Sequence, residues 1–160
     1  MPKLCGVTLI AVAAAAAPLA CSSSDSGSGA FDGPPPTVTI TSPMNADTVS
    51  IASSTDVPVM FSVANFTLKA PGSCGAVNPS CGHVHVLVDV TACNAPGLPY
   101  NNDFPTTGSA TSPATATAHL GTCATPAGMH TITIELHNDA HGLIAIQNVP
   151  VEDSVTITAQ

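Results

Sequence analysis

Short runs of alternating apolar and polar residues fill most of the chain after Pro36, and this pattern predicts an all-β domain. With a period of two, successive side chains lie on opposite faces of a strand. Pro, Gly, Asn and Asp separate the runs, as expected where short strands are joined by turns. The runs that we interpret as strands are residues 37–41, 57–63, 83–89, 115–120, 130–137, 143–151 and 154–159.

About seven short strands over roughly 120 residues are typical of a Greek-key β-sandwich of the immunoglobulin-like type. The stretches 37–43 and 128–133 also resemble immunoglobulin-like modules of bacterial surface proteins. That resemblance implies a structural or adhesive spacer that carries no chemistry. The Pro-rich segment 96–113 contains the only tyrosine, Tyr100, followed by three turn-forming residues. We interpret these residues as a turn rather than as a calcium site.

The acidic composition of the chain excludes one class of partner. Lys3 and Lys69 are the only basic residues other than histidine, against ten acidic residues. Removal of the first 20 residues would leave one lysine and all ten acidic side chains, which is a side-chain charge of −9. Such a surface repels phosphates, because neutralising them requires several lysines or arginines. We therefore expect no binding to nucleic acid.

The beginning of the chain has the composition of an export signal. A positive charge at Lys3 precedes an uncharged apolar run, residues 4–17, that is short for a membrane span. The boundary Pro18-Leu19-Ala20-Cys21 resembles the lipobox of bacterial lipoproteins, although Pro18 stands where that box usually has Leu. The resemblance implies cleavage before Cys21 and attachment of a lipid to its thiol.

The predicted chain has three parts. Residues 1–20 form a lipoprotein signal peptide, residues 21–36 a lipid-anchored tether, and residues 37–160 the β-sandwich domain. The tether is rich in Ser, Gly and Pro, a composition that buries no apolar surface. We expect the protein in the bacterial cell envelope, attached to a membrane through the lipid on Cys21. The periplasmic side and the cell surface both remain open, and so does a protein partner.

Four cysteines follow the tether, namely Cys74, Cys81, Cys93 and Cys123. An even number of cysteines in an exported domain predicts two disulfides, for which three connectivities exist. We prefer Cys74–Cys81, which closes a short loop, together with Cys93–Cys123. The alternative is a four-thiolate zinc site, but the sequence lacks the paired C-x-x-C units that are typical of such sites.

Histidines lie on the polar face of two predicted strands. In the strand 83–89, valines form one face, so His83 and His85 lie on the opposite, outward face. In the strand 130–137, isoleucine and leucine take the core, with His130 at the start of their face. Glu135 and His137 of that strand therefore lie outward as well.

These two strands would be antiparallel neighbours in one sheet, which would gather their outward side chains in one patch. We expect His141, in the turn that follows, to overhang the same end. Neutral imidazoles beside a carboxylate suit copper(II) or zinc. The predicted ligands are His83, His85 and His137, with His141 or Glu135 as a fourth. The alternative is that they are only polar residues of a half-exposed sheet.

A further resemblance concerns the first histidine strand. His83-Val84-His85, followed by Asp89, Thr91 and Cys93, resembles the copper-ligand strand of copper/zinc superoxide dismutases. The resemblance implies a Greek-key β-structure with an outer-face copper site, in which His137 would match a third copper ligand. The chain departs from that family because it has no Arg to guide the anion and no His after Cys93 at the place of the metal-bridging ligand. The resemblance therefore supports a copper-capable site more than it supports that enzyme.

Two functions of different classes follow from the sequence. The first is an envelope-anchored lipoprotein whose β-sandwich binds copper or zinc, and the second is an immunoglobulin-like interaction or scaffold module with no metal. The sequence contains no G-x-S-x-G elbow, no phosphate-binding loop and no H-E-x-x-H helix. We therefore assign no catalytic residues.

Overall fold

The structure is a computed structural model of the chain, and it describes residues 33–75, 78–94, 97–101 and 113–160. Within these ranges the regular structure consists of strands and one short 3-10 turn, Leu120–Thr122. The predicted all-β class is therefore confirmed. None of the described residues belongs to a helix with the length and apolar character needed to cross a bilayer. The predicted signal peptide and Cys21 lie outside the described residues.

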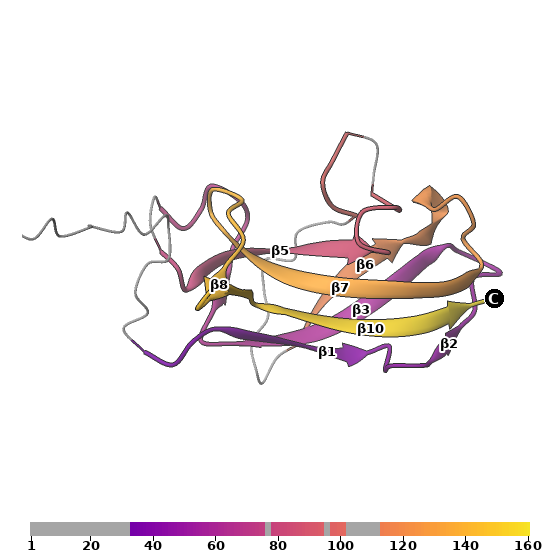
Figure 1. The fold of residues 1–160 in the computed structure, drawn as a ribbon, viewed down its shortest axis with the longest axis horizontal. Coiled ribbons are helices and arrows are strands. Elements are labelled where there is room, and N and C mark those ends of the chain that lie inside the picture. Colours follow the sequence, from indigo (N-terminus) through magenta and orange to yellow (C-terminus); the bar gives the residue numbers. More distant parts are fainter. Residues whose placement is uncertain (1–32, 76–77, 95–96, 102–112) are drawn as a thin grey trace, which may run out of the picture.

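Two sheets make up the two layers of the domain (Figure 1). The first has the order β1-β3-β6, formed by β1 (Thr37–Ser42), β3 (Asp56–Ala64) and β6 (Ala114–His119). The second has the order β2-β10-β7-β5-β4, formed by β2 (Thr48–Val49), β10 (Glu152–Ala159), β7 (Gly128–Asn138), β5 (Cys81–Val88) and β4 (Thr67–Leu68). A separate hairpin pairs β8 (Ala145–Ile146) with β9 (Val149–Pro150).

One apolar core lies between the two sheets. Alternate residues of β3 are buried, and the valines of β5 and the isoleucines and leucine of β7 join them in a single cluster. The side chain of Asp153 links the sheets at an edge, because its carboxylate accepts a hydrogen bond from the backbone N–H of Ile40 at 2.8 Å. The alternation in the sequence thus predicts the inner face of each long strand correctly.

The strand boundaries agree with the sequence pattern in six of the seven predicted ranges, to within a few residues. The seventh, residues 143–151, is wrong as a single strand, because it forms the β8–β9 hairpin. Gln147 and Asn148 form the turn of that hairpin with φ values of 52° and 66°, a left-handed pair that suits a tight two-residue turn. The two-residue strands β2 and β4 have too few residues to give a periodic signal.

The β5–β7 pair places the histidines. The strands are antiparallel, with His83 opposite His137 and His85 opposite Glu135, as expected from the sequence. At Gly82 the two backbones approach so closely that an added Cβ would overlap the carbonyl group of His137. A glycine at this position therefore lets the beginning of β5 pair tightly with the end of β7.

The four cysteines form two disulfides, Cys74–Cys81 and Cys93–Cys123, with Cα–Cα distances of 5.8 and 4.4 Å. These are the two pairs preferred from the sequence. Because all four sulfurs are in disulfides, the alternative of a four-thiolate zinc site is wrong for this structure.

Candidate metal centre

Three imidazole nitrogens converge at one end of β5. His83 Nε2 lies 3.2 Å from His85 Nε2 and 3.1 Å from His141 Nδ1. The third side of the triangle, from His85 Nε2 to His141 Nδ1, measures 3.3 Å. We call His83, His85 and His141 the histidine tripod. Together they form one of the groups of potential metal-ligand atoms among the described residues.

The size of this triangle suits a small divalent ion. Zinc binds imidazole nitrogen at about 2.0–2.1 Å. An ion at that distance from all three nitrogens would lie about 0.9 Å out of their plane, with nitrogen–metal–nitrogen angles of about 98–107°. These angles lie close to the tetrahedral value, so the tripod could hold an ion with little rearrangement.

Two members of the tripod come from the same face of β5. His83 and His85 are two residues apart, so they lie on the face opposite the core valines. The sequence predicts this face correctly but not the burial of the histidines on it. His83 is 0% exposed, His85 4% and His137 8%. Other parts of the chain cover this face of the sheet, which periodicity alone does not show.

The third member comes from the turn after β7. The side-chain oxygen of Asn138 accepts hydrogen bonds from the backbone N–H groups of Ala140 and Gly142, both at 2.9 Å. These bonds bend the chain so that His141 points back over β5, with its backbone in the left-handed region at φ 61°. The structure thus brings His141 to the place expected from the sequence.

A neighbouring disulfide loop supports this turn. The carboxylate of Asp139 accepts hydrogen bonds from the backbone N–H of Ser73 at 2.9 Å and of Cys74 at 3.1 Å. Cys74 is joined to Cys81, the first residue of β5. The turn that carries His141 is therefore tied to the beginning of the strand that carries the other two histidines.

Burial keeps the two strand histidines neutral. The pKa of His83 is lowered from 6.5 to about 4, mainly by desolvation and also by His141 and His137, while Asp139 opposes the shift. Desolvation also lowers the pKa of His85, to about 3, with His137 as the next cause. A neutral imidazole keeps one nitrogen lone pair, which is the form that binds metal ions. Both side chains are therefore ready to act as ligands near neutral pH.

His137 and Glu135 lie beside the tripod. The ring of His137 stacks on that of His85, with centroids 3.8 Å apart. Its Nδ1 lies 3.0 Å from the His141 carbonyl oxygen, and its Nε2 lies 3.1 Å from Glu135 Oε2. Both partners accept hydrogen bonds, so each contact forms when the ring nitrogen that faces it carries a proton. In this arrangement His137 holds the turn in place, and a ligand role for it or for Glu135 stays a prediction.

A cavity of about 600 Å³ adjoins the tripod. Its walls include two of the tripod histidines, the Glu135–His137 pair and several apolar side chains, with the following residues lining it: His85, Leu87, Val90, Thr91, Pro99, Tyr100, Glu135, His137 and His141. The ring of Tyr100 lies 4.2 Å from that of His85 between centroids. The sequence gives no indication that Tyr100 is part of the site, except that it is the only tyrosine of the chain.

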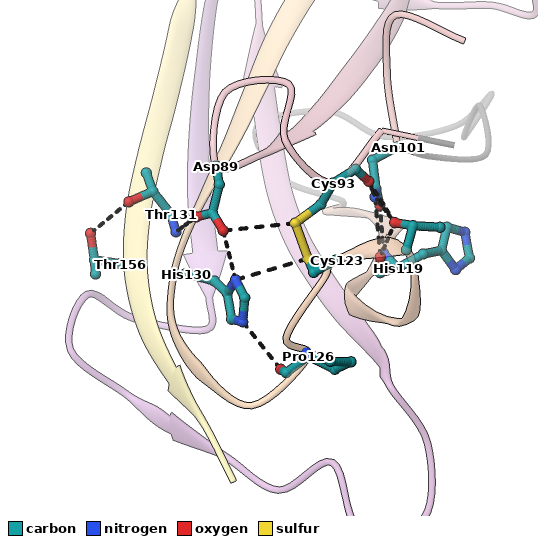
Figure 2. A network of polar contacts seen from close by, with 10 residues as sticks. Asp89, Cys93, Asn101, His119, Cys123, Pro126, His130, Thr131 and Thr156 are labelled. Atoms are coloured by element: carbon teal, nitrogen blue, oxygen red, sulfur yellow. Dashed lines mark hydrogen bonds and ion pairs between the residues drawn. A yellow bond between two sulfur atoms is a disulfide. The ribbon is translucent and has the colours of Figure 1, made fainter. Parts of the chain in front are cut away.

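Asn101 explains why Tyr100 lies there. Its backbone N–H donates to the Val86 carbonyl at 2.8 Å, which sets this segment alongside β5. Its buried side-chain amide also bonds to the carbonyl oxygens of Cys93 and His119 (Figure 2). A buried amide with this many partners fixes the backbone on both sides of it.

A second group of potential ligands surrounds the Cys93–Cys123 disulfide (Figure 2). His130 is buried, and its Nδ1 lies 2.8 Å from Asp89 Oδ2 and 4.0 Å from the sulfur of Cys123. Metal binding by cysteine requires a thiolate, and these two sulfurs are joined to each other. The remaining pair has an evident structural role, because Asp89 also accepts a hydrogen bond from the backbone N–H of Thr131 at 2.8 Å. The tripod is therefore the better candidate site.

No family model, curated protein or solved structure gives a significant match to the chain. The function is therefore inferred from the geometry of the site.

Proposed function

We propose that the domain binds one copper or zinc ion through the histidine tripod, outside the cytoplasm, on a chain anchored by lipid at Cys21. The observation that carries the metal proposal is the convergence of three imidazole nitrogens at 3.1–3.3 Å from one another. Copper(II) and zinc both accept three imidazoles with further positions left for other ligands.

Hydrogen bonding among the three rings is a poorer explanation of this arrangement. Each of these nitrogens carries at most one proton, and a protonated nitrogen of a neutral imidazole has no lone pair left to accept. If one ring donates to the other two, those two still direct lone pairs at each other. If two or three of these nitrogens carried protons, their N–H groups would point at one another. A cation at the centre satisfies all three lone pairs at once.

Metal titration of the oxidised chain, purified without a histidine tag, tests the proposal. We expect one equivalent of copper(II) or zinc to bind with micromolar affinity or better by calorimetry. A His85→Ala, His141→Ala double variant should lose this binding and keep its fold. The matched control is His119→Ala, which removes a histidine from the other sheet, where His119 pairs with Asp56 at 2.8 Å. Weak binding without a defined stoichiometry would instead support an interaction module without a metal.

The anchoring proposal rests on the sequence around Cys21 and agrees with the two disulfides, which persist in oxidising compartments. Expression in a bacterium with a labelled fatty acid tests it. We expect the label on the wild-type chain and none on a Cys21→Ser variant. An unlabelled wild-type chain would contradict the anchoring and leave the metal proposal untouched.

A further inference from the structure

We propose that the ion enters and leaves the tripod by exchange of His141, and that the incoming ligand is a neutral nitrogen donor bound in the adjoining cavity. This inference rests on the proposed metal site and adds the route and chemical class of its exchange partner. In the exchange step, a nitrogen lone pair forms a bond to the ion and the bond from His141 Nδ1 breaks, with no change of oxidation state.

The three ligands differ in burial. His83 and His85 are 0% and 4% exposed, whereas His141 is exposed to solvent. A ligand from solution can reach an ion most easily on the side of its exposed ligand. His141 is therefore the member of the tripod that an incoming donor can replace.

The three ligands also differ in how their backbones are held. His83 and His85 lie on β5, which is hydrogen-bonded to β7 on one side and to β4 on the other. His141 lies in the short turn after β7, with its N–H donating to the Asn138 carbonyl at 3.0 Å. An exposed side chain in a turn can change rotamer without opening of the backbone. The His141 ring can therefore leave the ion while the other two remain in place.

The cavity shows where the incoming ligand would lie. It borders His141 and His85, so a molecule in it can reach an ion on the tripod. Leu87 and Pro99 supply apolar walls, and Tyr100 lies beside them with an aromatic ring. A ligand with an apolar or aromatic body would bury that body against these walls.

Hydrogen bonding selects the class of donor. Glu135 lines the same cavity, and its carboxylate oxygens accept hydrogen bonds. An N–H group beside the donor atom could hydrogen-bond to this carboxylate, whereas an anion such as azide has no N–H group to donate. An imidazole fits these conditions, either as a free small molecule or as a histidine side chain of another protein.

Chemical rescue tests the exchange of His141. Cobalt(II) serves as a visible substitute for zinc, and imidazole is the probe. We expect His141→Gly to lose cobalt affinity by at least the roughly 10–100-fold that loss of an outer-shell partner costs. Millimolar imidazole should restore most of this affinity and the wild-type absorption spectrum. His83→Gly, which removes the most buried ligand, should not be rescued.

Transfer kinetics of the wild-type chain give a second test that needs no ligand variant. Imidazole should speed zinc transfer to a chromophoric chelator, and azide at the same concentration should speed it less. Leu87→Trp should fill the cavity and remove the acceleration while one zinc still binds, because Leu87 lies on the same face of β5 as His85. Val149→Trp, on the exposed β9, is the control and should behave as wild type.

The outcomes separate this inference from the proposed function. If the wild-type chain binds no metal, the proposed function itself fails. If it binds one equivalent but imidazole neither rescues His141→Gly nor speeds transfer, the tripod is a static site and the exchange inference is wrong. If His83→Gly is rescued as well as His141→Gly, the ion is not exchanged through His141 in particular. If acceleration by imidazole survives Leu87→Trp, the donor does not use this cavity.

Discussion

The substitution Gly82→Ala tests whether the close pairing of β5 and β7 assembles the site. A Cβ at Gly82 would lie 2.9 Å from the Asn138 Cα and 3.0 Å from the His137 carbonyl carbon, with the His137 carbonyl oxygen closer still. All three atoms belong to the backbone, so no flexible side chain can move aside. The start of β5 must therefore separate from β7.

The loss in free energy of unfolding caused by Gly82→Ala can be estimated from other substitutions that overpack a site. Forcing a methyl group into a fully packed position typically costs about 1–3 kcal/mol, and the rigid backbone here places Gly82→Ala at about 2–3 kcal/mol. With a urea dependence of about 1.5 kcal/mol per molar, the unfolding midpoint should fall by about 1–2 M. Because His83 directly follows Gly82, metal affinity should fall as well, by tenfold or more as an order-of-magnitude estimate.

The assay is urea unfolding followed by circular dichroism, together with the metal titration. Gly33→Ala is the matched control, because a Cβ there has no heavy atom within 4 Å. The control should change the free energy of unfolding by less than about 0.5 kcal/mol. Wild-type stability and affinity in Gly82→Ala would refute the argument that the β5–β7 approach at this point requires glycine.

Three further predictions concern charge and hydrogen bonding. In the metal-free protein, the pKa values of His83 and His85 are lower in the folded state than in the unfolded state, so the unfolded chain binds protons at a higher pH. The free energy of unfolding should therefore decrease as the pH falls from about 6.5 toward 4. Urea titrations across this range check the trend, and a His85→Asn variant should show a smaller dependence. Asp139→Ala should reduce metal affinity several-fold in calorimetry while the fold persists, because it frees the His141 turn from the Cys74–Cys81 loop. His130→Gln should lower the free energy of unfolding by about 1–3 kcal/mol, because it breaks the contact between the buried His130 ring and the partly exposed Asp89 carboxylate. By contrast, His119→Gln, at the half-exposed pair with Asp56, should cost less than about 1 kcal/mol in the same measurement.

The faces and partners of the long strands are predictable from the sequence. Alternation over 83–89 and 130–137 places the valines, isoleucines and leucine in the core and the histidines of β5 on the other face. The antiparallel pairing of β5 with β7 then brings His83 opposite His137. Because these features depend on the side-chain period of two, a single sequence is enough to reveal them.

What covers that polar face is not predictable in the same way. Tyr100 lies in a Pro-rich segment with no repeating pattern, and hydrogen bonds of Asn101 to distant strands set its position. The orientation of His137 depends on its contacts with Glu135 and with the turn after β7. A strand period specifies the face on which a side chain lies and gives no information about its rotamer. The sequence therefore predicts the right patch but not the membership of the tripod.

The hydrogen bonds from Ser73 and Cys74 to Asp139 suggest an order of maturation for the domain. The turn around His141 is fastened to the loop that the Cys74–Cys81 disulfide closes, so the disulfide helps to hold the third ligand in place. In a reducing compartment this loop would be open and the third ligand would be held less firmly. For a chain that folds after export, as proposed, oxidation would come first and metal capture second. Such an order would place metal binding by the tripod after export.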